Sequence, residues 1–204
     1  MGIPLHIIMD HPAKLGNSTL LDLIRIYMDG SSLTNTTPKK GGWCYLVEKN
    51  HRITQIQSQG FCGTNNEAEL RALVESLKFL ESCEGDSIVE LYTDSSYVLK
   101  HLFTFSPKKE KNLILVGTID SPGGFAPSGI LKRSPPNYYP ELWDECQELL
   151  RKVSLSHTIY LWWLRAHLTK KVAAQHRLLK VHSGHHNTVD IEARRVARNF
   201  SFSK

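Results

Sequence analysis

The sequence predicts a single α/β domain, and three observations support that fold class. The chain has 204 residues, enough for one well-filled core with surface insertions but hardly for two full domains. Hydrophobic residues make up 41% and charged residues 22%, which is the balance of a folded globular protein. The hydrophobic pattern changes between strand and helix periods in the order βββαβα over the first half of the chain. We therefore expect an N-terminal extension at 1–21 and one domain at 22–204.

Three segments near the N-terminus have the pattern of β-strands. In LIRIYMDGSS, the residues Ile24, Ile26 and Met28 alternate with their neighbours, and the segment ends in a Gly/Ser turn. The segments GGWCYLVEKN and HRITQIQSQGF are rich in residues that favour strands, and polar residues at 49–51 separate them. The three segments are expected to form an antiparallel meander.

A helix and a strand–helix pair follow the meander. The segment AELRALVESLKFL carries one apolar stripe at helical spacing, formed by Leu70, Leu73, Val74, Leu77 and Leu80. The segment DSIVELYTDSS is a nearly continuous apolar run, which is typical of a buried strand, and its last residues include Asp94. The segment YVLKHLF then begins a second helix.

The second half of the chain adds two helices and a strand around an insertion. Residues 106–140 hold most of the prolines together with glycines and lysines, which predicts a long surface insertion. Within it, NLILVGTI is a candidate for a small extra strand. Beyond it, ELWDECQELLRKV and TVDIEARRVARNF have the helical period, and HTIYLWWLRAH between them is the last clear strand.

The net charge and the cysteines indicate which class of partner and which cellular compartment to expect. The formal net charge of +5 favours a polyanionic partner without identifying it. The four cysteines lie far apart and form no CxxC pair, so a reducing compartment fits better than a zinc site or a disulfide framework. No apolar run approaches the roughly 20 residues that cross a bilayer, and the first residues do not resemble a secretory signal. We expect a soluble cytoplasmic protein with no membrane partner.

Four acidic residues lie where a strand or helix meets a polar loop: Asp29, Glu69, Asp94 and Asp190. Strand ends converge on one edge of an α/β sheet, so acids from two strand ends can meet there. Clustered carboxylates repel one another unless a divalent cation lies between them, and oxygen ligands favour Mg²⁺ or Mn²⁺ over zinc. Each acid also has a local interpretation as a turn residue, a helix cap or a first-turn acid, so only the set indicates a metal site.

The contexts of these acids resemble type 1 ribonuclease H (RNase HI) in order and spacing. The matching stretches span about 24–198 and are IYMDGSS, GGWCYLV, GTNNEAELRALVESL, LYTDSSYV, ELWDECQELL, IYLWWLRAH and HSGHHNTVDIEARRVAR. The resemblance implies a ribonuclease H-like fold, in which a mixed five-stranded sheet with three antiparallel strands followed by parallel ones is flanked by helices.

The same resemblance implies an activity and its cofactors. The four acids would be catalytic and would bind two Mg²⁺ ions, with Mn²⁺ as a possible substitute. The reaction would be endonucleolytic hydrolysis of the RNA strand of an RNA/DNA hybrid, leaving 5′-phosphate and 3′-hydroxyl ends. We expect a monomer that uses no organic cofactor. Two alternatives stay open: a ribonuclease H domain of a retroelement or viral polymerase, and a catalytically silent fold that only binds nucleic acid.

The resemblance also implies contacts with the substrate. Hydroxyl and amide groups can read the ribose 2′-hydroxyl that DNA lacks, although residues of this kind at a helix start can act only as caps, and a tryptophan on a helix is often a core residue. Basic side chains in PKKEK and LKR would grip phosphates or form a solvated loop. The expected substrate contacts are Gly30, Ser31, Thr64, Asn65, Asn66, Ser95, Trp143 and Asn187.

Two histidines compete for the position of a histidine that the family carries in a loop before the fourth acid. His167 directly follows the last strand, whereas His182 has the expected neighbours in HSGHHN but lies only eight residues before Asp190. Residues 168–181 would then be a second insertion. We favour His182, and either residue could instead be an ordinary exposed histidine.

The motif TNNEAEL contains two glutamates with different expected roles. Thr64 and Glu67 have the spacing of a capping box, in which both side chains satisfy free amides at the helix start. Glu69 lies about 200° further round the helix and is expected to face the metal site.

Overall fold

The computed structural model describes residues 21–103, 112–120, 124–125, 138–168 and 177–201. Residues 1–20 of the N-terminal extension, the basic side chains of PKKEK and LKR, and residues 169–176 of the second insertion lie outside these ranges. The described elements, in chain order, are β1 (Asp22–Leu33), β2 (Lys40–Lys49), β3 (Arg52–Cys62), α1 (Asn65–Glu81), β4 (Ser87–Thr93), α2 (Ser96–Leu102), β5 (Leu113–Asp120), β6 (Gly124–Phe125), α3 (Pro140–Val153), β7 (His157–Leu164) and α5 (Arg177–Asn199).

One mixed sheet joins all of the described strands, in the order β3-β2-β1-β4-β7-β5-β6. The pairs β1–β2 and β2–β3 are antiparallel, which confirms the predicted meander, and β1, β4 and β7 run parallel to one another. The expected count of five strands is wrong, because β5 pairs antiparallel with β7 and β6 extends that edge. Part of the predicted surface insertion is therefore built into the sheet, since the apolar run NLILVGTI can continue the exposed edge of β7.

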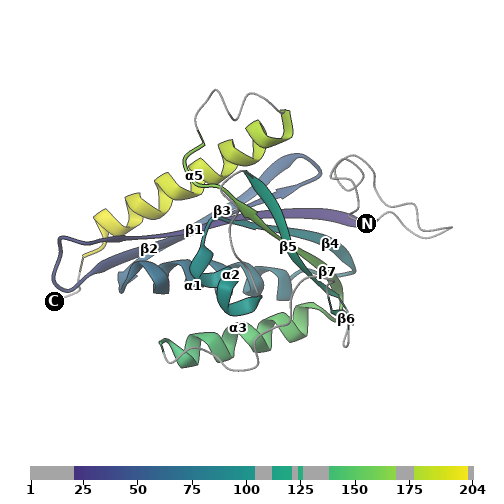
Figure 1. Cartoon of the computed structure of the whole chain (residues 1–204), viewed down its shortest axis with the longest axis horizontal. Helices are drawn as coiled ribbons and strands as arrows, with labels where there is room; N and C mark the ends of the chain where they lie inside the picture. The colour runs from purple at the N-terminus through teal and green to yellow at the C-terminus, as the bar shows by residue number, and fades with distance from the viewer. Residues whose placement is uncertain (1–20, 104–111, 121–123, 126–137, 169–176, 202–204) are drawn as a thin grey trace.

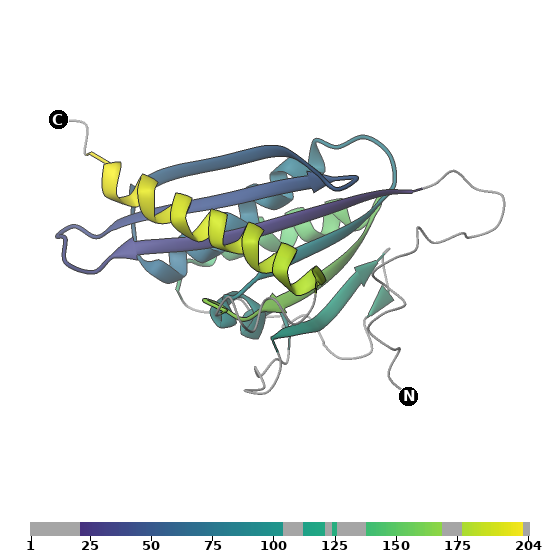
Figure 2. The same ribbon diagram turned by 90° about the horizontal axis from the view of Figure 1, so that it is seen from above.

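Helices cover the two faces of the sheet unequally (Figures 1 and 2). Helix α5 crosses one face over β1, β2 and β3, while α1 packs against β1 and β2 on the other face with α3 beyond it. The apolar stripe of α1 is buried as predicted, with Leu70, Leu73 and Leu77 all 0% exposed. Each such leucine stabilises the fold by roughly 1.5–3 kcal/mol, so packing of this stripe fixes α1 against the sheet.

Helix α5 begins 13 residues before Asp190 and is longer than the sequence suggested. It lies very close to β2, because Gly42 has no side chain: a Cβ there would come within 2.3 Å of the backbone oxygen of Ala193. This approach sets the position of α5, and hence of Asp190, over the sheet. Within the part of the chain that the structure describes, no helix combines the length and the apolar character needed to cross a membrane.

Candidate active site

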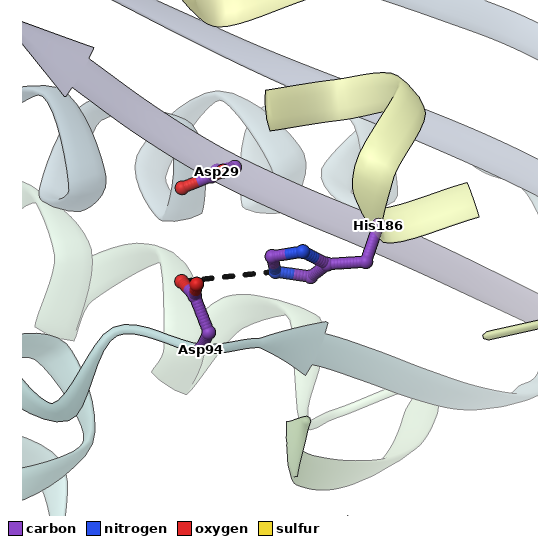
Figure 3. A group of neighbouring side chains, drawn as sticks. All are labelled: Asp29, Asp94 and His186. Atoms are coloured by element: carbon purple, nitrogen blue, oxygen red, sulfur yellow. Dashed lines mark ion pairs between the residues drawn. The ribbon is translucent and has the colours of Figure 1, made fainter. Parts of the chain in front are cut away.

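Two of the four predicted acids meet at the carboxyl-terminal side of β1 and β4. Asp29 lies within β1, four residues before its last residue, Leu33, and Asp94 directly follows β4. The two strands are parallel with Tyr27 opposite Tyr92, so the residues two places further along each strand reach the same edge. Carboxylate oxygens of Asp29 and Asp94 lie within 4.8 Å of each other, and Figure 3 shows both side chains at this edge.

Helices α1 and α5 bring the other two acids to the same edge. Glu69 lies in the second turn of α1 and is 9% exposed, and the side chain of Asp190 in α5 is 13% exposed. The backbone N–H of Gly30 donates to Asp29 Oδ1 at 2.7 Å and to Glu69 Oε2 at 3.2 Å. A Cβ at Gly30 would lie 2.2 Å from the backbone of Ala68, so glycine allows β1 and α1 to approach this closely.

Burial and mutual repulsion raise the pKa of three of these acids. Burial is the main cause that raises the pKa of Asp29 well above its ordinary value, and Asp94 and Asp190 add to it. Burial also raises the pKa of Glu69, and the charges of Asp29 and then Asp94 are the next largest causes. Burial raises the pKa of Asp94 as well, although His186 opposes the change. Acids that repel one another in this way are suited to hold a divalent cation, and the oxygen donors fit Mg²⁺ or Mn²⁺.

The two glutamates of TNNEAEL point to different partners. The backbone N–H of Glu67 donates to Thr64 Oγ1 at 3.3 Å, which confirms Thr64 as the cap of α1. The carboxylate of Glu67 instead receives hydrogen bonds from Arg71 at 3.0 and 3.1 Å, one turn further along the helix, so the expectation that it satisfies a free amide is wrong. Thr64 also forms a hydrogen bond with the hydroxyl of Tyr139. Glu67 therefore stabilises the start of α1, whereas Glu69 belongs to the acidic cluster.

The loop position expected for His182 is wrong. His182 lies inside α5 and is 2% exposed, with its Nδ1 at 2.7 Å from the hydroxyl of Tyr27 and its ring stacked on Tyr92. Burial lowers the pKa of His182 to about 4. Its imidazole is thus directed at the tyrosines of the sheet, and the helix begins early because those buried partners are available to it.

Two other histidines lie beside the acids. His167 is exposed in the turn after β7, and its Nε2 lies 3.4 Å from Nη2 of Arg194. Nε of the same arginine contacts Asp190 Oδ1 at 2.8 Å. His186 is 5% exposed, and its Nε2 lies 3.7 Å from Asp94 Oδ1. Figure 3 shows the ring of His186 directed from α5 toward the acids. Burial lowers the pKa of His186, and the nearby Asp94 opposes that change.

Sequence reasoning missed His186. The signal was its spacing of four residues before Asp190, which places both side chains on one face of a helix. The spacing has that meaning only if HSGHHN is helical, and the Gly and Asn in this segment favoured a loop instead.

The expected substrate contacts lie in several environments. Asn65 and Asn66 are exposed at the start of α1, and Asn187 is exposed on α5. Ser95 caps α2 by accepting a hydrogen bond from the backbone N–H of Val98 at 3.2 Å. Ser31 is half-buried on β1 beside Gly30.

The expectation that Trp143 contacts the substrate is wrong. Trp143 is 1% exposed in α3, and its indole nitrogen donates to the hydroxyl of Tyr97 at 3.3 Å. The alternative interpretation as a core residue is confirmed, because the apolar face of α3 packs inward.

A cavity of about 590 Å³ opens beside the acids, between the turn after β7 and the first half of α5. Asp94 and Asp190 line it together with basic side chains that include Arg165, Lys180, His167 and His186. This juxtaposition suits the backbone of a nucleic acid. The basic groups attract the phosphates of the backbone, and a cation held by the acids would polarise the phosphate nearest to it.

The strand order, the covering helices and the four clustered acids define the ribonuclease H-like class of fold. Among solved structures, LC9-RNase H1, described as a type 1 RNase H with the type 2 active-site motif, has a TM-score of 0.58 at 18% identity and covers 90% of this chain and 76% of its own. LC11-RNase H1 in complex with RNA/DNA hybrid has a TM-score of 0.54 at 14% identity, covering 86% of this chain and 97% of its own. At these identities the likeness establishes the fold.

Sequence comparison identifies the family within this class. The sequence profile of the family described as RNase H matches residues 22–197. A ribonuclease H of Campylobacter curvus (strain 525.92) is 36% identical over 146 residues, which are 71% of this chain and 80% of the relative. The chain belongs to the RNase H family.

Proposed function

We propose that this protein hydrolyses the RNA strand of RNA/DNA hybrids at internal positions, leaving 5′-phosphate and 3′-hydroxyl ends. The observation that carries the proposal is the convergence of Asp29, Glu69, Asp94 and Asp190 on one edge of the sheet, beside a cavity that contains basic side chains. Membership of the RNase H family supports it. The solved LC11-RNase H1 is a complex with RNA/DNA hybrid, which supports the choice of substrate.

The four acids would hold two divalent cations, Mg²⁺ or Mn²⁺. Such cations, when bound, supply an activated water and neutralise the charge that develops on the phosphoryl oxygens. The protein groups provide the rest: the N–H of Gly30 orients the carboxylates of Asp29 and Glu69, and burial keeps competing water away from both. No protein nucleophile is needed.

The surroundings of the acids would bind the two strands. Arg165 and Lys180 line the cavity and would contact phosphates, which adds affinity that falls with salt. Asn65 and Asn66 are exposed at the start of α1, where their amides can both donate to and accept from a 2′-hydroxyl. We further propose that the protein acts as a monomer, because one chain supplies all four acids.

A cleavage assay tests this function. Purified protein with Mg²⁺ is expected to cut a labelled RNA/DNA hybrid and to leave duplex DNA and single-stranded RNA intact. Asp94→Asn is expected to abolish cutting while the far-UV circular dichroism spectrum stays unchanged, because Asp94 follows β4 and is not part of the core. Binding of the hybrid without cleavage in either Mg²⁺ or Mn²⁺ would show that the protein only binds nucleic acid.

A further inference from the structure

His186 places a nitrogen that makes no hydrogen bond to a described residue beside the acidic cluster. The side chain is 5% exposed, and its Nε2 has no hydrogen-bond partner among the residues that the structure describes. A buried polar nitrogen without a partner destabilises a protein, so its retention beside the acids calls for a ligand that the nitrogen can bind.

The geometry around His186 suits a shared metal ion better than a hydrogen bond. Nε2 lies 3.7 Å from Asp94 Oδ1, which is too long for a hydrogen bond. Ligand atoms of Asp29, Asp94 and His186 all lie within 4.8 Å of one another. In an octahedral site with bonds of about 2.1 Å, neighbouring ligand atoms are about 3.0 Å apart and opposite ones about 4.2 Å. The 3.7 Å separation between His186 Nε2 and Asp94 Oδ1 lies between these two values, and Figure 3 shows the ring directed toward the carboxylates.

The orientation of α5 directs His186 to this position. One turn earlier, His182 Nδ1 lies 2.7 Å from the Tyr27 hydroxyl, and on the adjacent face His185 Nε2 lies 3.0 Å from Glu48 Oε2. These two contacts with the sheet fix the rotation of the helix about its axis. His186 and Asp190, four residues apart, then reach the acids from one face of the helix.

We propose that His186 Nε2 is a ligand of the catalytic metal together with Asp29 and Asp94, so that this site prefers a transition-metal ion, Mn²⁺, to Mg²⁺. Mg²⁺ is a hard ion that takes oxygen ligands, whereas affinity for imidazole rises along the first transition series. The inference rests on the proposed function in taking the four acids as metal ligands. The competing role for His186 is an ion pair with Asp94 that involves no metal.

Pulsed EPR of the Mn²⁺-loaded protein without nucleic acid tests the ligand directly. Wild type is expected to show coupling between the Mn²⁺ electron spin and a directly bound ¹⁴N nucleus. His186→Gln is expected to lose this coupling, whereas the matched control His167→Gln, in the exposed turn of the same cavity, is expected to keep it. Absence of ¹⁴N coupling in wild type would overturn the proposal, and that measurement needs no variant to fold.

Titration calorimetry measures the selectivity. We expect His186→Gln to weaken Mn²⁺ binding about tenfold or more and to change Mg²⁺ binding less than twofold. Loss of a residue that only hydrogen-bonds to a metal ligand already lowers metal affinity by about 10–100-fold. Equal losses of affinity for Mn²⁺ and Mg²⁺ would support the ion pair between His186 and Asp94 and contradict the metal-ligand role. Cleavage of the hybrid without ¹⁴N coupling would refute the role of His186 and leave the proposed function intact. Coupling to ¹⁴N without cleavage would support the role of His186 and refute the proposed function.

Discussion

Replacing Glu69 by glutamine tests the acidic cluster in a way that separates stability from activity. Glu69 is buried, its charge is opposed by Asp29, Asp94 and Asp190, and its carboxylate accepts a hydrogen bond from the N–H of Gly30. An amide oxygen can keep that hydrogen bond, while the negative charge disappears. Removing repulsion that shifts a pKa by one unit changes the free energy of unfolding by about 1.4 kcal/mol. The metal-free variant should therefore be more stable than wild type by about 1 kcal/mol at pH 7.

Glu67→Gln is the matched control, two residues earlier on the same helix. Its carboxylate pairs with Arg71, whose side chain is 39% exposed, so the ion pair is partly solvated. Loss of an exposed pair with this spacing costs about 0.3–0.5 kcal/mol. Cleavage of the hybrid should stay at the wild-type level, because Glu67 faces away from the acids.

Metal binding then distinguishes the two variants. A ligand at 100 times its Kd stabilises a folded protein by about 2.7 kcal/mol, and Glu69→Gln should lose most of this gain in Mg²⁺ while Glu67→Gln keeps it. Cleavage by Glu69→Gln should fall by at least about 100-fold, since even indirect changes at metal sites reach that size. Urea unfolding with and without Mg²⁺, followed by circular dichroism, and a hybrid-cleavage gel measure both effects. Loss of metal stabilisation and cleavage in Glu67→Gln, with both retained in Glu69→Gln, would refute the assignment.

Three further predictions follow from the same contacts. Gly30→Ala should destabilise the protein by about 1–3 kcal/mol in urea unfolding and reduce cleavage, because its Cβ would force β1 and α1 apart; an unchanged midpoint would contradict the close approach. Glu48→Gln should cost about 3 kcal/mol at pH 7, because it breaks a buried ion pair with Arg25. Hydrogen bonds from His185 and Arg25 lower the pKa of Glu48 to about 2, so its contribution should disappear between about pH 4.5 and 2, and the two proteins should converge in stability at acid pH. In metal-free protein, the raised pKa of Asp29 and Glu69 should make stability fall as the pH rises above their ordinary values of 3.8 and 4.5, and added Mg²⁺ should abolish that fall; a pH-independent midpoint over this range would contradict it.

Much of the site was predictable from local sequence patterns. The alternation of Ile24, Ile26 and Met28 defined β1, and the apolar run before Asp94 defined β4, so the meeting of two acids followed from the parallel pairing of their strands. The separation of Glu67 from Glu69 around α1 was predictable too, because a 100° helical step is a property of the chain itself. The capping spacing predicted the role of Thr64, but the carboxylate of Glu67 binds Arg71.

Other features depended on the three-dimensional surroundings. Trp143 carries no local signal that separates a core residue from a surface contact, and the inward face of α3 decides it. The run NLILVGTI joins the sheet because β7 offers it an edge, which is a property of the assembled strands.

The chain by itself determined the fold class, the four acids and the start of α1, because periodicity, capping and strand ends act over a few residues. Only the tertiary structure decided which histidine faces the acids. Helix α5 extends through HSGHHN because Tyr27 and Glu48 on the sheet bind His182 and His185, and that long-range pairing turns His186 toward Asp94. The energy of such buried contacts outweighs the local preference of Gly and Asn for a loop.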